Sequence, residues 1–199
     1  MALSAPPRPS PPGREFRWRI THFRLIRGAV AAAVSGFDAR RESAVINDAV
    51  REDIRHSVLC WLATVDENGQ PNVSPKELFT DHGEDAILIA DIASPVSVRN
   101  LARNPLVCVS FVDVFRQRGF KIAGRTRLIA PVDPDFAVYG ARLQELAGPD
   151  FQVRHAIHVA VTRISRIWAP SYALFPDRTV EDQQARAHAA YGVRPASSA

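Results

Sequence analysis

Lysine is scarce in this sequence: Lys76 and Lys121 stand against 23 arginines in 199 residues. Long apolar runs are missing too, because the best candidate, residues 28–37, is short and rich in alanine. A helix that spans a membrane needs about 20 consecutive apolar residues. We therefore expect no membrane partner and a cytoplasmic location. The 46% apolar and 23% charged residues are typical of a globular protein.

The net charge of +4 is unevenly distributed. Residues 1–44 hold eight arginines and three acidic residues, whereas the rest of the chain holds 17 basic and 18 acidic residues. The positive charge therefore belongs to the N-terminal segment, and the remainder is close to neutral. Binding along a phosphodiester backbone requires a basic surface. We predict no nucleic-acid partner.

Cysteine and the common catalytic motifs are also rare or absent. Cys60 and Cys108 lie in apolar, strand-like runs, which favours buried reduced thiols over a disulfide or a redox pair. The sequence has no GxGxxG, P-loop, CxxC, HExxH or GxSxG motif. His155 and His158 are three residues apart in a strand pattern, so their side chains face opposite sides. We predict no metal site.

The first 44 residues differ in composition from the rest. They begin with a proline-rich stretch and continue with an arginine-rich, acid-poor and partly apolar one. Three interpretations stay open: an assigned start upstream of the true one, a disordered functional tail, or a targeting segment. We expect one folded domain over residues 45–176 and a C-terminal tail over residues 177–199.

From residue 45 onward, hydrophobic periodicity predicts a mainly β domain. A helix is expected over residues 45–57, and strands over residues 57–66 and 71–79 joined by an Asn-Gly turn of type I′. The later elements follow the same logic: strands at 86–91, 106–114, 119–132 with a bulge at Gly124, and 155–170, and helices at 94–105 and 133–150. About six strands and three helices result. Hairpin connections favour an antiparallel barrel with helices at its rim.

One face of the second strand is unusually polar. Ser74 and Lys76 share it, whereas Val73 and Phe79 are expected to face the core. Ser94 and Ser97 open the following short helix, where N–H groups favour an anion. A strand lysine and nearby hydroxyls can together hold a phosphate monoester. The alternative is that the serines are only caps and that both lysines are solvated at the rim.

The ordered series of motifs resembles a known family. CWLATVDENGQPNVSPKELF, followed by LIADIASPVSVRNLARNPLVCVSFVDVFRQRGFKIAGRTRLI, is similar to the FMN-binding split-barrel proteins related to pyridoxamine 5′-phosphate oxidase. The resemblance covers roughly residues 46–170. It implies a six-stranded antiparallel split β-barrel, a homodimer, and FMN in two clefts at the subunit interface.

The resemblance also assigns the cofactor site residue by residue. Residues 73–76 would meet the flavin and its ribityl phosphate, and Lys121 would lie near the N1–C2=O edge of the ring. The implied FMN-binding residues are Val73, Ser74, Pro75, Lys76, Ala90, Asp91, Ser97, Asn100, Gly119 and Lys121. No catalytic residue is assigned, although Asp91 and Arg118 are candidates and Trp168 is a candidate for packing on the ring.

Two departures from the oxidase bear on function. The arginine that opens its second-strand motif is missing here, and its C-terminal arginine-tryptophan region is matched only by RIWAP at residues 166–170. Vitamin B6 oxidation is therefore less expected than flavin binding. We expect an FMN-dependent oxidoreductase that acts on a small molecule, with electrons from a nicotinamide or deazaflavin partner. A flavin-binding module for sensing, storage or electron relay is the alternative, and deazaflavin or haem could replace FMN.

Overall fold

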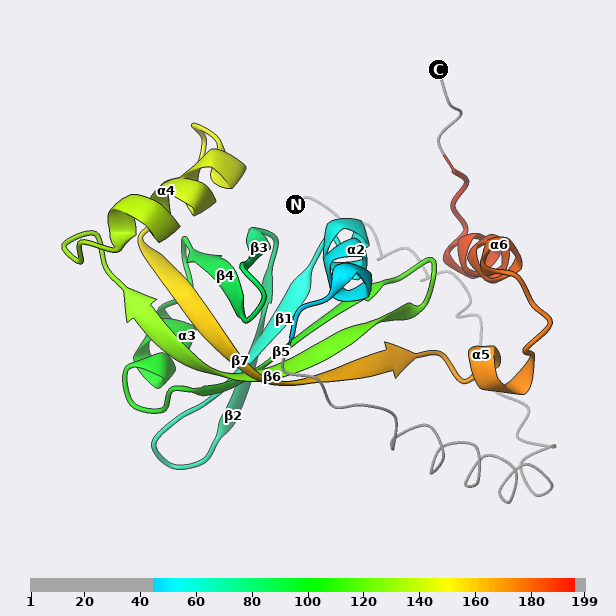
Figure 1. Ribbon diagram of the computed structural model, residues 1–199, viewed down its shortest axis with the longest axis horizontal. Helices are drawn as coiled ribbons and strands as arrows, with labels where there is room; N and C mark the ends of the chain where they lie inside the picture. The colour runs from blue at the N-terminus through cyan, green and yellow to red at the C-terminus, as the bar shows by residue number, and fades with distance from the viewer. Residues whose placement is uncertain (1–44, 196–199) are drawn as a thin grey trace, which may run out of the picture. The chain divides into compact units, whose positions relative to one another are not determined.

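The computed structural model describes residues 45–195, so all interpretations of residues 1–44 lie outside the described part (Figure 1). The elements, in chain order, are α2 (Asp48–His56), β1 (Cys60–Val65), β2 (Pro71–Lys76), β3 (Phe79–His82), β4 (Ala86–Asp91), α3 (Pro95–Leu101), β5 (Leu106–Asp113), β6 (Arg118–Ile129), α4 (Phe136–Ala147), β7 (His155–Trp168), α5 (Ser171–Leu174) and α6 (Val180–Tyr191).

All seven strands belong to one antiparallel sheet with the order β2-β1-β5-β6-β7-β4-β3. The two outermost strands, β2 and β3, follow each other in the chain and are separated only by Glu77 and Leu78. A sheet whose two edges are joined by so short a link has to curl until the edges approach each other. This confirms the mainly β split-barrel class with peripheral helices, although the described residues form seven strands rather than six.

The extra strand comes from a break in the predicted strand over residues 71–79. β2 pairs with β1, whereas Phe79 at the start of β3 lies opposite Ile89 of β4. The expectation that Val73 faces the core is wrong, because its side chain is 56% exposed and the inward positions of β2 are the polar ones. Phe79 does pack against the core, as predicted.

The turn between β1 and β2 also differs from its prediction. A type I′ turn needs positive φ at both central residues, but only Gly69 has it, with φ +82°. The link is a wider loop, since Asp66 Oδ1 accepts hydrogen bonds of 2.8 Å from the backbone N–H groups of Asn68 and Gln70. The predicted bulge at Gly124 is confirmed by a register shift between β6 and β7 at that residue.

The main core fills the concave side of the sheet. Side chains from β1, β4, β5, β6 and β7 meet there. Val50 and Ile54 of α2 close it, together with Ile46 just before that helix, and all three are almost fully buried. A second cluster packs Leu143 of α4 against Leu88 and Ile129. Figure 1 shows α4 beside the ends of β4 and β7, with α3 next to β2. Cys60 and Cys108 are both free thiols, as expected, but only Cys60 is fully buried and Cys108 is half-buried.

The C-terminal residues form two helices, α5 and α6, and the second lies where the sequence predicted a tail from residue 177. The described residues contain five helices instead of three, because α5 and α6 follow β7. Phe115, in the turn between β5 and β6, stacks on His188 of α6 with 4.5 Å between ring centroids. The Tyr172 hydroxyl donates a 2.5 Å hydrogen bond to the Arg116 carbonyl in the same turn. Between residues 45 and 195 no helix is long and apolar enough to cross a membrane.

Candidate functional site

A seam of polar side chains runs between β2 and α3. The Ser74 and Ser97 hydroxyls lie 3.0 Å apart, and Lys76 Nζ donates a hydrogen bond to Ser94 Oγ. Further along, Asn100 Nδ2 donates to Thr64 Oγ1 over 3.1 Å. We call this row, from the Thr64–Asn100 end to the Lys76–Ser94 end, the polar seam.

Local sequence explains why these side chains meet. Alternation along β2 sends Asn72, Ser74 and Lys76 to one side of the strand. Pro95 occupies the first turn of α3, which suits its fixed φ and missing N–H group. Ser97 and Asn100 are three residues apart and therefore share the helix face that packs on the sheet, where both are almost fully buried.

Lys76 is the central charge of the seam. Its side chain is almost fully buried, with 7% exposed, so the interpretation of Lys76 as a solvated rim charge is wrong. Burial lowers the pKa of Lys76, and the nearby Asp91 carboxylate partly offsets that shift. Burying an ammonium group costs free energy unless the group is paired and hydrogen-bonded, and here Ser94 and Asp91 supply those contacts.

Asp91 links the seam to β7. Its Oδ1 accepts a 3.0 Å hydrogen bond from the Ser94 backbone N–H, and its Oδ2 lies 2.8 Å from His155 Nδ1. Asp91 is 3% exposed. Ser94 precedes α3 but makes no side-chain capping bond, because its hydroxyl is engaged by Lys76 instead. Lys76, Ser94, Asp91 and His155 thus form one continuous chain of contacts.

Each end of the polar seam opens into a hollow. The hollow at the Lys76 end has a volume of about 430 Å³ and is also lined by residues from α4 and the loop after it. The hollow at the other end has a volume of about 280 Å³ and is lined by Asn72, Arg99, Asn100 and Arg103, among others. Arg103 there is paired with Glu67 at 2.6 Å.

The donors of the seam fit a phosphorylated polyol such as the ribityl phosphate of FMN. Three hydroxyl groups (Ser74, Ser94 and Ser97) can each donate or accept, and one ammonium group supplies positive charge. The oxygen atoms of a ligand could replace the hydrogen bonds that these groups now make to one another, Ser74 to Ser97 and Lys76 to Ser94. The seam therefore has the donor chemistry that such a cofactor requires.

The structure brings some of the predicted cofactor residues together and separates others. Those in or beside the polar seam are Ser74, Lys76, Ala90, Asp91, Ser97 and Asn100. Val73 and Pro75 belong to β2, but their side chains alternate to the outward face of the sheet. Gly119 and Lys121 lie on β6.

The β6 residues sit well away from the seam within one chain. The register connects Lys121 to Ser110 of β5, Ser110 to Trp61 of β1, and Trp61 to Pro75 of β2. Three strand spacings amount to roughly 14 Å. Lys121 is exposed on the outward face of the sheet.

Three residues of the site were not predicted. Thr64 is fully buried and accepts from both Asn72 and Asn100, at 3.3 and 3.1 Å. A threonine at an inward position of an otherwise apolar strand is a signal that could have pointed to it. Asn72 carried the same signal as Ser74 and Lys76, because alternation along β2 puts all three on one side of the strand. His155 carried none, because a tertiary contact alone gives it its partner.

Arg118 belongs to a different cluster. Its Nε lies 3.3 Å from Asp53 Oδ1, and Arg116 Nη2 donates over 2.7 Å to Glu52. Burial raises the pKa of Asp53, and Arg118 opposes that shift. This cluster ties α2 to the β5–β6 turn. Arg118 lies opposite Trp168 in the sheet, whereas the polar seam meets His155 at the other end of β7, which is roughly 40 Å away along the 14-residue strand.

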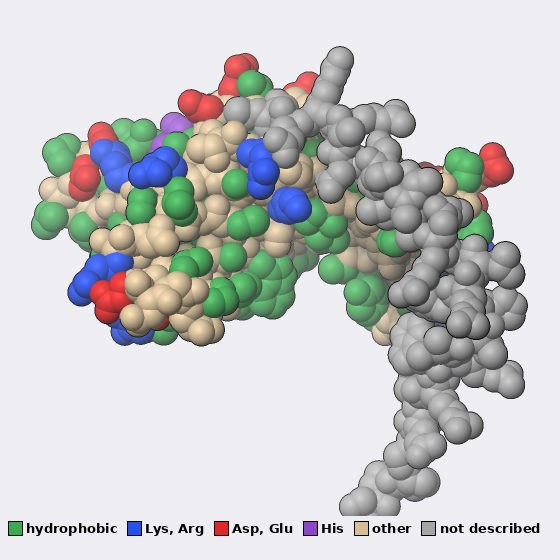
Figure 2. Space-filling model, turned by 90° about the horizontal axis from the view of Figure 1, so that it is seen from below, with side chains coloured by type: hydrophobic (Ala, Val, Ile, Leu, Met, Phe, Trp, Pro, Cys, Tyr) green, Lys and Arg blue, Asp and Glu red, His purple; other side chains and the backbone are tan. Residues whose placement is uncertain are grey.

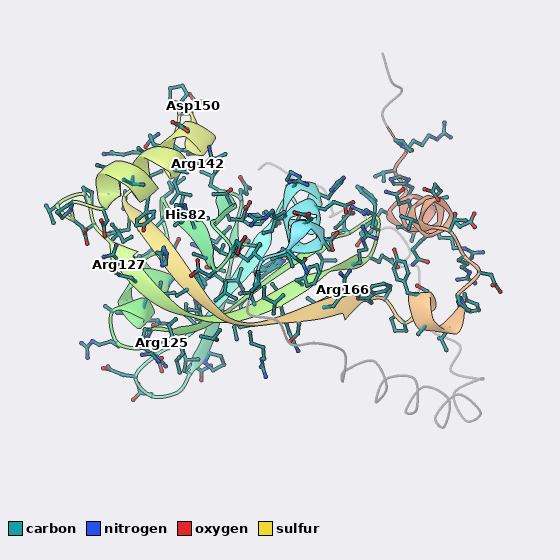
Figure 3. All side chains as sticks on the ribbon, viewed as in Figure 1. His82, Arg125, Arg127, Arg142, Asp150 and Arg166 are labelled. Atoms are coloured by element: carbon teal, nitrogen blue, oxygen red, sulfur yellow. The ribbon has the colours of Figure 1, made fainter. Side chains whose placement is uncertain are left out.

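Figure 3 shows Arg166 toward the same far end of β7. Its guanidinium lies 4.4 Å from the centroid of the Phe120 ring and 5.1 Å from that of Trp168, and Trp168 in turn stacks edge-on with Tyr172 at 5.0 Å. In the described part of the chain, no group of three or more His, Cys, Asp or Glu side chains is arranged to hold a metal ion.

Comparisons with known proteins agree on one fold. The family model described as pyridoxamine 5′-phosphate oxidase matches residues 46–168. HupZ from Group A Streptococcus has a TM-score of 0.55 and 22% identity, over 62% of this chain and 95% of that chain. An FMN-binding protein from Syntrophomonas wolfei has a TM-score of 0.53 and 15% identity, over 73% of this chain and 98% of that one.

HutZ, the heme storage protein from Vibrio cholerae, has a TM-score of 0.50 and 17% identity, over 62% of this chain and 94% of that one. At such identities these structures share the fold alone with this chain. No curated protein matches the sequence.

Proposed function

Because the chain belongs to the pyridoxamine 5′-phosphate oxidase family, we propose that it is a flavoprotein that holds FMN along the polar seam between β2 and α3. The observation that carries the proposal is the almost fully buried Lys76, which is surrounded by hydroxyl groups and engages Ser94. Burial of an ammonium group costs free energy, and a phosphate group bound in the seam would offset that cost by pairing with it.

The residues of the seam have distinct tasks in this proposal. Lys76 supplies positive charge to the cofactor, and Ser74 and Ser97 supply hydroxyl donors. Thr64 fixes the amide of Asn100 by accepting its hydrogen bond at 3.1 Å. Asp91 holds the Ser94 backbone and thereby the start of α3. FMN, when bound, supplies the transfer of a hydride or of single electrons, and the protein positions and tunes it.

We also propose that the protein is a homodimer with the cofactor at the subunit interface. The outward face of β2, β1 and β5 exposes three large apolar side chains, Val73 at 56%, Trp61 at 46% and Leu106 at 53%. Large apolar side chains exposed on one face of a sheet support an interface. Figure 2, seen from below, shows hydrophobic side chains spread over the described surface with scattered charged ones between them. A second chain on this face would also supply the exposed Lys121.

The reaction that this arrangement supports is electron transfer between a nicotinamide or deazaflavin donor and a small molecule. Purification should yield a yellow protein, and heat should release a chromophore with the mass of FMN. Titration of flavin-free protein with FMN should show saturable binding. A colourless protein that takes up no FMN would refute the flavoprotein proposal.

A non-catalytic flavin-binding module is the second candidate. The titratable side chains of the seam are Lys76, Asp91 and His155. Lys76 and Asp91 both contact Ser94, and His155 contacts Asp91, so none of the three is left as an acid or base for a substrate. If FMN binds but NAD(P)H leaves the yellow colour unbleached without oxygen, this candidate is favoured. Deazaflavin or haem in place of FMN would appear as a different released mass and absorption spectrum.

A further inference from the structure

The contact between Asp91 and His155 joins two strands beside the polar seam. Asp91 ends β4, His155 begins β7, and the two residues lie opposite each other in the sheet. Asp91 Oδ2 lies 2.8 Å from His155 Nδ1. A carboxylate can only accept hydrogen bonds, so Nδ1 carries the hydrogen, and Nε2 is the nitrogen that can take up a proton. The His155 side chain is 29% exposed, so solvent reaches the imidazole, whereas Asp91 is almost fully buried.

Asp91 connects His155 to the residues that would contact a ligand. Its Oδ1 accepts from the Ser94 backbone N–H at 3.0 Å, and its carbonyl accepts from the Arg154 backbone N–H at 2.8 Å. The Ser94 hydroxyl in turn accepts a hydrogen bond from Lys76. Ser94 and Lys76 line the hollow of about 430 Å³, and neither Asp91 nor His155 does. His155 therefore acts on a ligand at Lys76 through Asp91.

The charges of Lys76 and Asp91 balance each other until a phosphate binds. Burial lowers the pKa of Lys76, and the Asp91 carboxylate opposes that shift. A phosphate monoester at Lys76 adds a charge of about −1.5 to −2 at pH 7. One ammonium group cannot neutralise both anions, and two like charges in a partly buried site disfavour each other. An imidazolium at His155, 2.8 Å from Asp91, would offset the carboxylate.

The other ionisable groups around His155 have different partners or face solvent. On the β6 side, β7 continues with Ala156 opposite Ile129, and both are apolar. The remaining groups are Arg142 and Glu145 of α4, which lie 3.7 Å apart, Tyr139 of α4 and His158 of β7, whose ring centroids are 5.3 Å apart, and Arg154, which is exposed. Histidine is the side chain that ordinarily changes its charge between about pH 5 and 8. His155 is therefore placed to respond to a new anion near neutral pH.

From these contacts we propose that His155 is a positioning residue of the cofactor site, and that it takes up a proton when a phosphate group binds at Lys76. The proton comes from solvent and adds to Nε2, and the imidazolium keeps its Nδ1 hydrogen bond to Asp91. No bond to the ligand forms or breaks. The inference rests on the proposed function in that the phosphate is that of FMN. Because linkage is reciprocal, His155 should also make FMN bind more tightly as the pH falls.

The test compares the wild type with His155→Gln and His155→Leu in the flavin-free, full-length protein. Glutamine can still donate to Asp91 but carries no charge, whereas leucine does neither. Calorimetric titration with FMN in buffers of different ionisation enthalpy, from pH 6 to pH 8, gives the number of protons taken up. The wild type should take up about half a proton per chain more than His155→Gln at its maximum, and its affinity should gain about tenfold over this range relative to that variant. The second ionisation of the phosphate, near about pH 6, is common to all variants and cancels in the difference.

The two substitutions separate the charge of His155 from its hydrogen bond. At pH 8, where histidine is ordinarily neutral, His155→Gln should bind FMN within about twofold of the wild type. His155→Leu should bind FMN at least about fivefold more weakly at pH 6 and at pH 8, because Asp91 loses a hydrogen-bond donor. His158→Gln is the matched control on the same strand, since the His158 ring lies against Tyr139 instead. It should keep the affinity and the proton uptake of the wild type.

A second probe separates this inference from the proposed function. Inorganic phosphate, added to the flavin-free protein at pH 7, should move the NMR resonances of the His155 ring toward their imidazolium positions, and Lys76→Met should abolish the response. A protein that takes up no FMN but shows this response refutes the flavoprotein proposal and keeps the role of His155. The inference is overturned if neither FMN nor phosphate moves these resonances, or if the wild type and His155→Gln take up equal numbers of protons. It is also overturned if His155→Gln loses as much affinity at pH 8 as His155→Leu, which would leave His155 a structural role alone.

Discussion

At the residue scale, the buried charge of Lys76 is expected to lower the stability of the fold while it serves the binding of FMN. Burial lowers its pKa below the usual value of 10.5, which means that the folded protein holds the proton less tightly than the unfolded chain does. Replacing a buried charge by an apolar group of similar size is often neutral or stabilising. Stability alone therefore does not explain a lysine at this position.

We expect Lys76→Met to leave the free energy of unfolding unchanged or to raise it by about 1 kcal/mol, while FMN binding weakens by at least about tenfold. Chemical denaturation and flavin titration measure the two effects separately. Lys121→Met, at the exposed lysine, is the control for stability. A variant that loses stability and FMN in equal measure would make Lys76 a structural residue.

The same pKa shift predicts a pH dependence. Between the lowered pKa of Lys76 in the folded state and 10.5 in the unfolded state, the unfolded chain binds the extra proton. The free energy of unfolding should therefore rise with pH through that window. Lys76→Met removes this contribution, so the variant should show a smaller rise than the wild type when unfolding is measured from pH 8 to pH 10.5. Identical slopes would contradict the burial of a charged Lys76.

Cys60 should be chemically silent. It is fully buried, and burial raises its pKa to about 12, so at pH 8 only roughly one molecule in ten thousand carries the reactive thiolate. A chromogenic disulfide reagent should label the folded protein at Cys108 alone and both thiols after unfolding. Rapid labelling of two thiols in the native protein would contradict the packing around β1.

At the level of elements, β6 is packed so closely that one of its residues has to be glycine. A Cβ atom on Gly119 would overlap the carbonyl oxygen of Phe111 in β5. This close backbone contact explains why residue 119 is a glycine without any role for a cofactor. The family resemblance assigned the same residue to the flavin, and the two roles have different consequences for stability.

Gly119→Ala should lower the free energy of unfolding by about 2–4 kcal/mol, because a backbone atom cannot move aside as a flexible side chain can. Thermal and denaturant unfolding measure the loss. Arg125→Ala, on an exposed position of the same strand, should change stability by less than about 0.5 kcal/mol. If Gly119→Ala is stable and only FMN binding falls, the glycine belongs to the cofactor site.

Element boundaries were predictable where a local signal existed. The Pro95 start of α3 and the Gly124 bulge follow from the conformational preferences of proline and glycine. The division of residues 71–79 into β2 and β3 was not predictable. The chain changes partner between Lys76, which still pairs with Cys60 of β1, and Leu78, whose carbonyl accepts from Ala90 of β4 at 2.9 Å.

At the level of the whole molecule, the dimer proposal rests on the outward face of β2, β1 and β5, where Trp61, Val73 and Leu106 are exposed. Trp61→Asp should convert the protein to monomers, because it places a charge in the middle of that face, and FMN binding should fall with it. Analytical ultracentrifugation and flavin titration check both. Val132→Asp, at an exposed apolar residue after β6, is the control. A dimer that survives Trp61→Asp would place the interface elsewhere.

The sequence by itself determined the fold class and half of the candidate site. Alternation placed Ser74 and Lys76 on one face of a strand, helical spacing placed Ser97 and Asn100 together, and the order of the motifs indicated the family. These are local properties, which depend on periods of 2 and 3.6 residues. They could not say on which side of the sheet the core would form, so Val73 was assigned to the wrong face.

Only the tertiary structure decided the rest. It buried Lys76, joined Asp91 to His155 across 64 residues, and placed Lys121 three strand spacings from β2. It also placed Leu146 and Ala147 of α4 against the hollow beside Lys76. Burial and long-range contacts depend on how the sheet curls, and the curl is set by the pairing of all seven strands together.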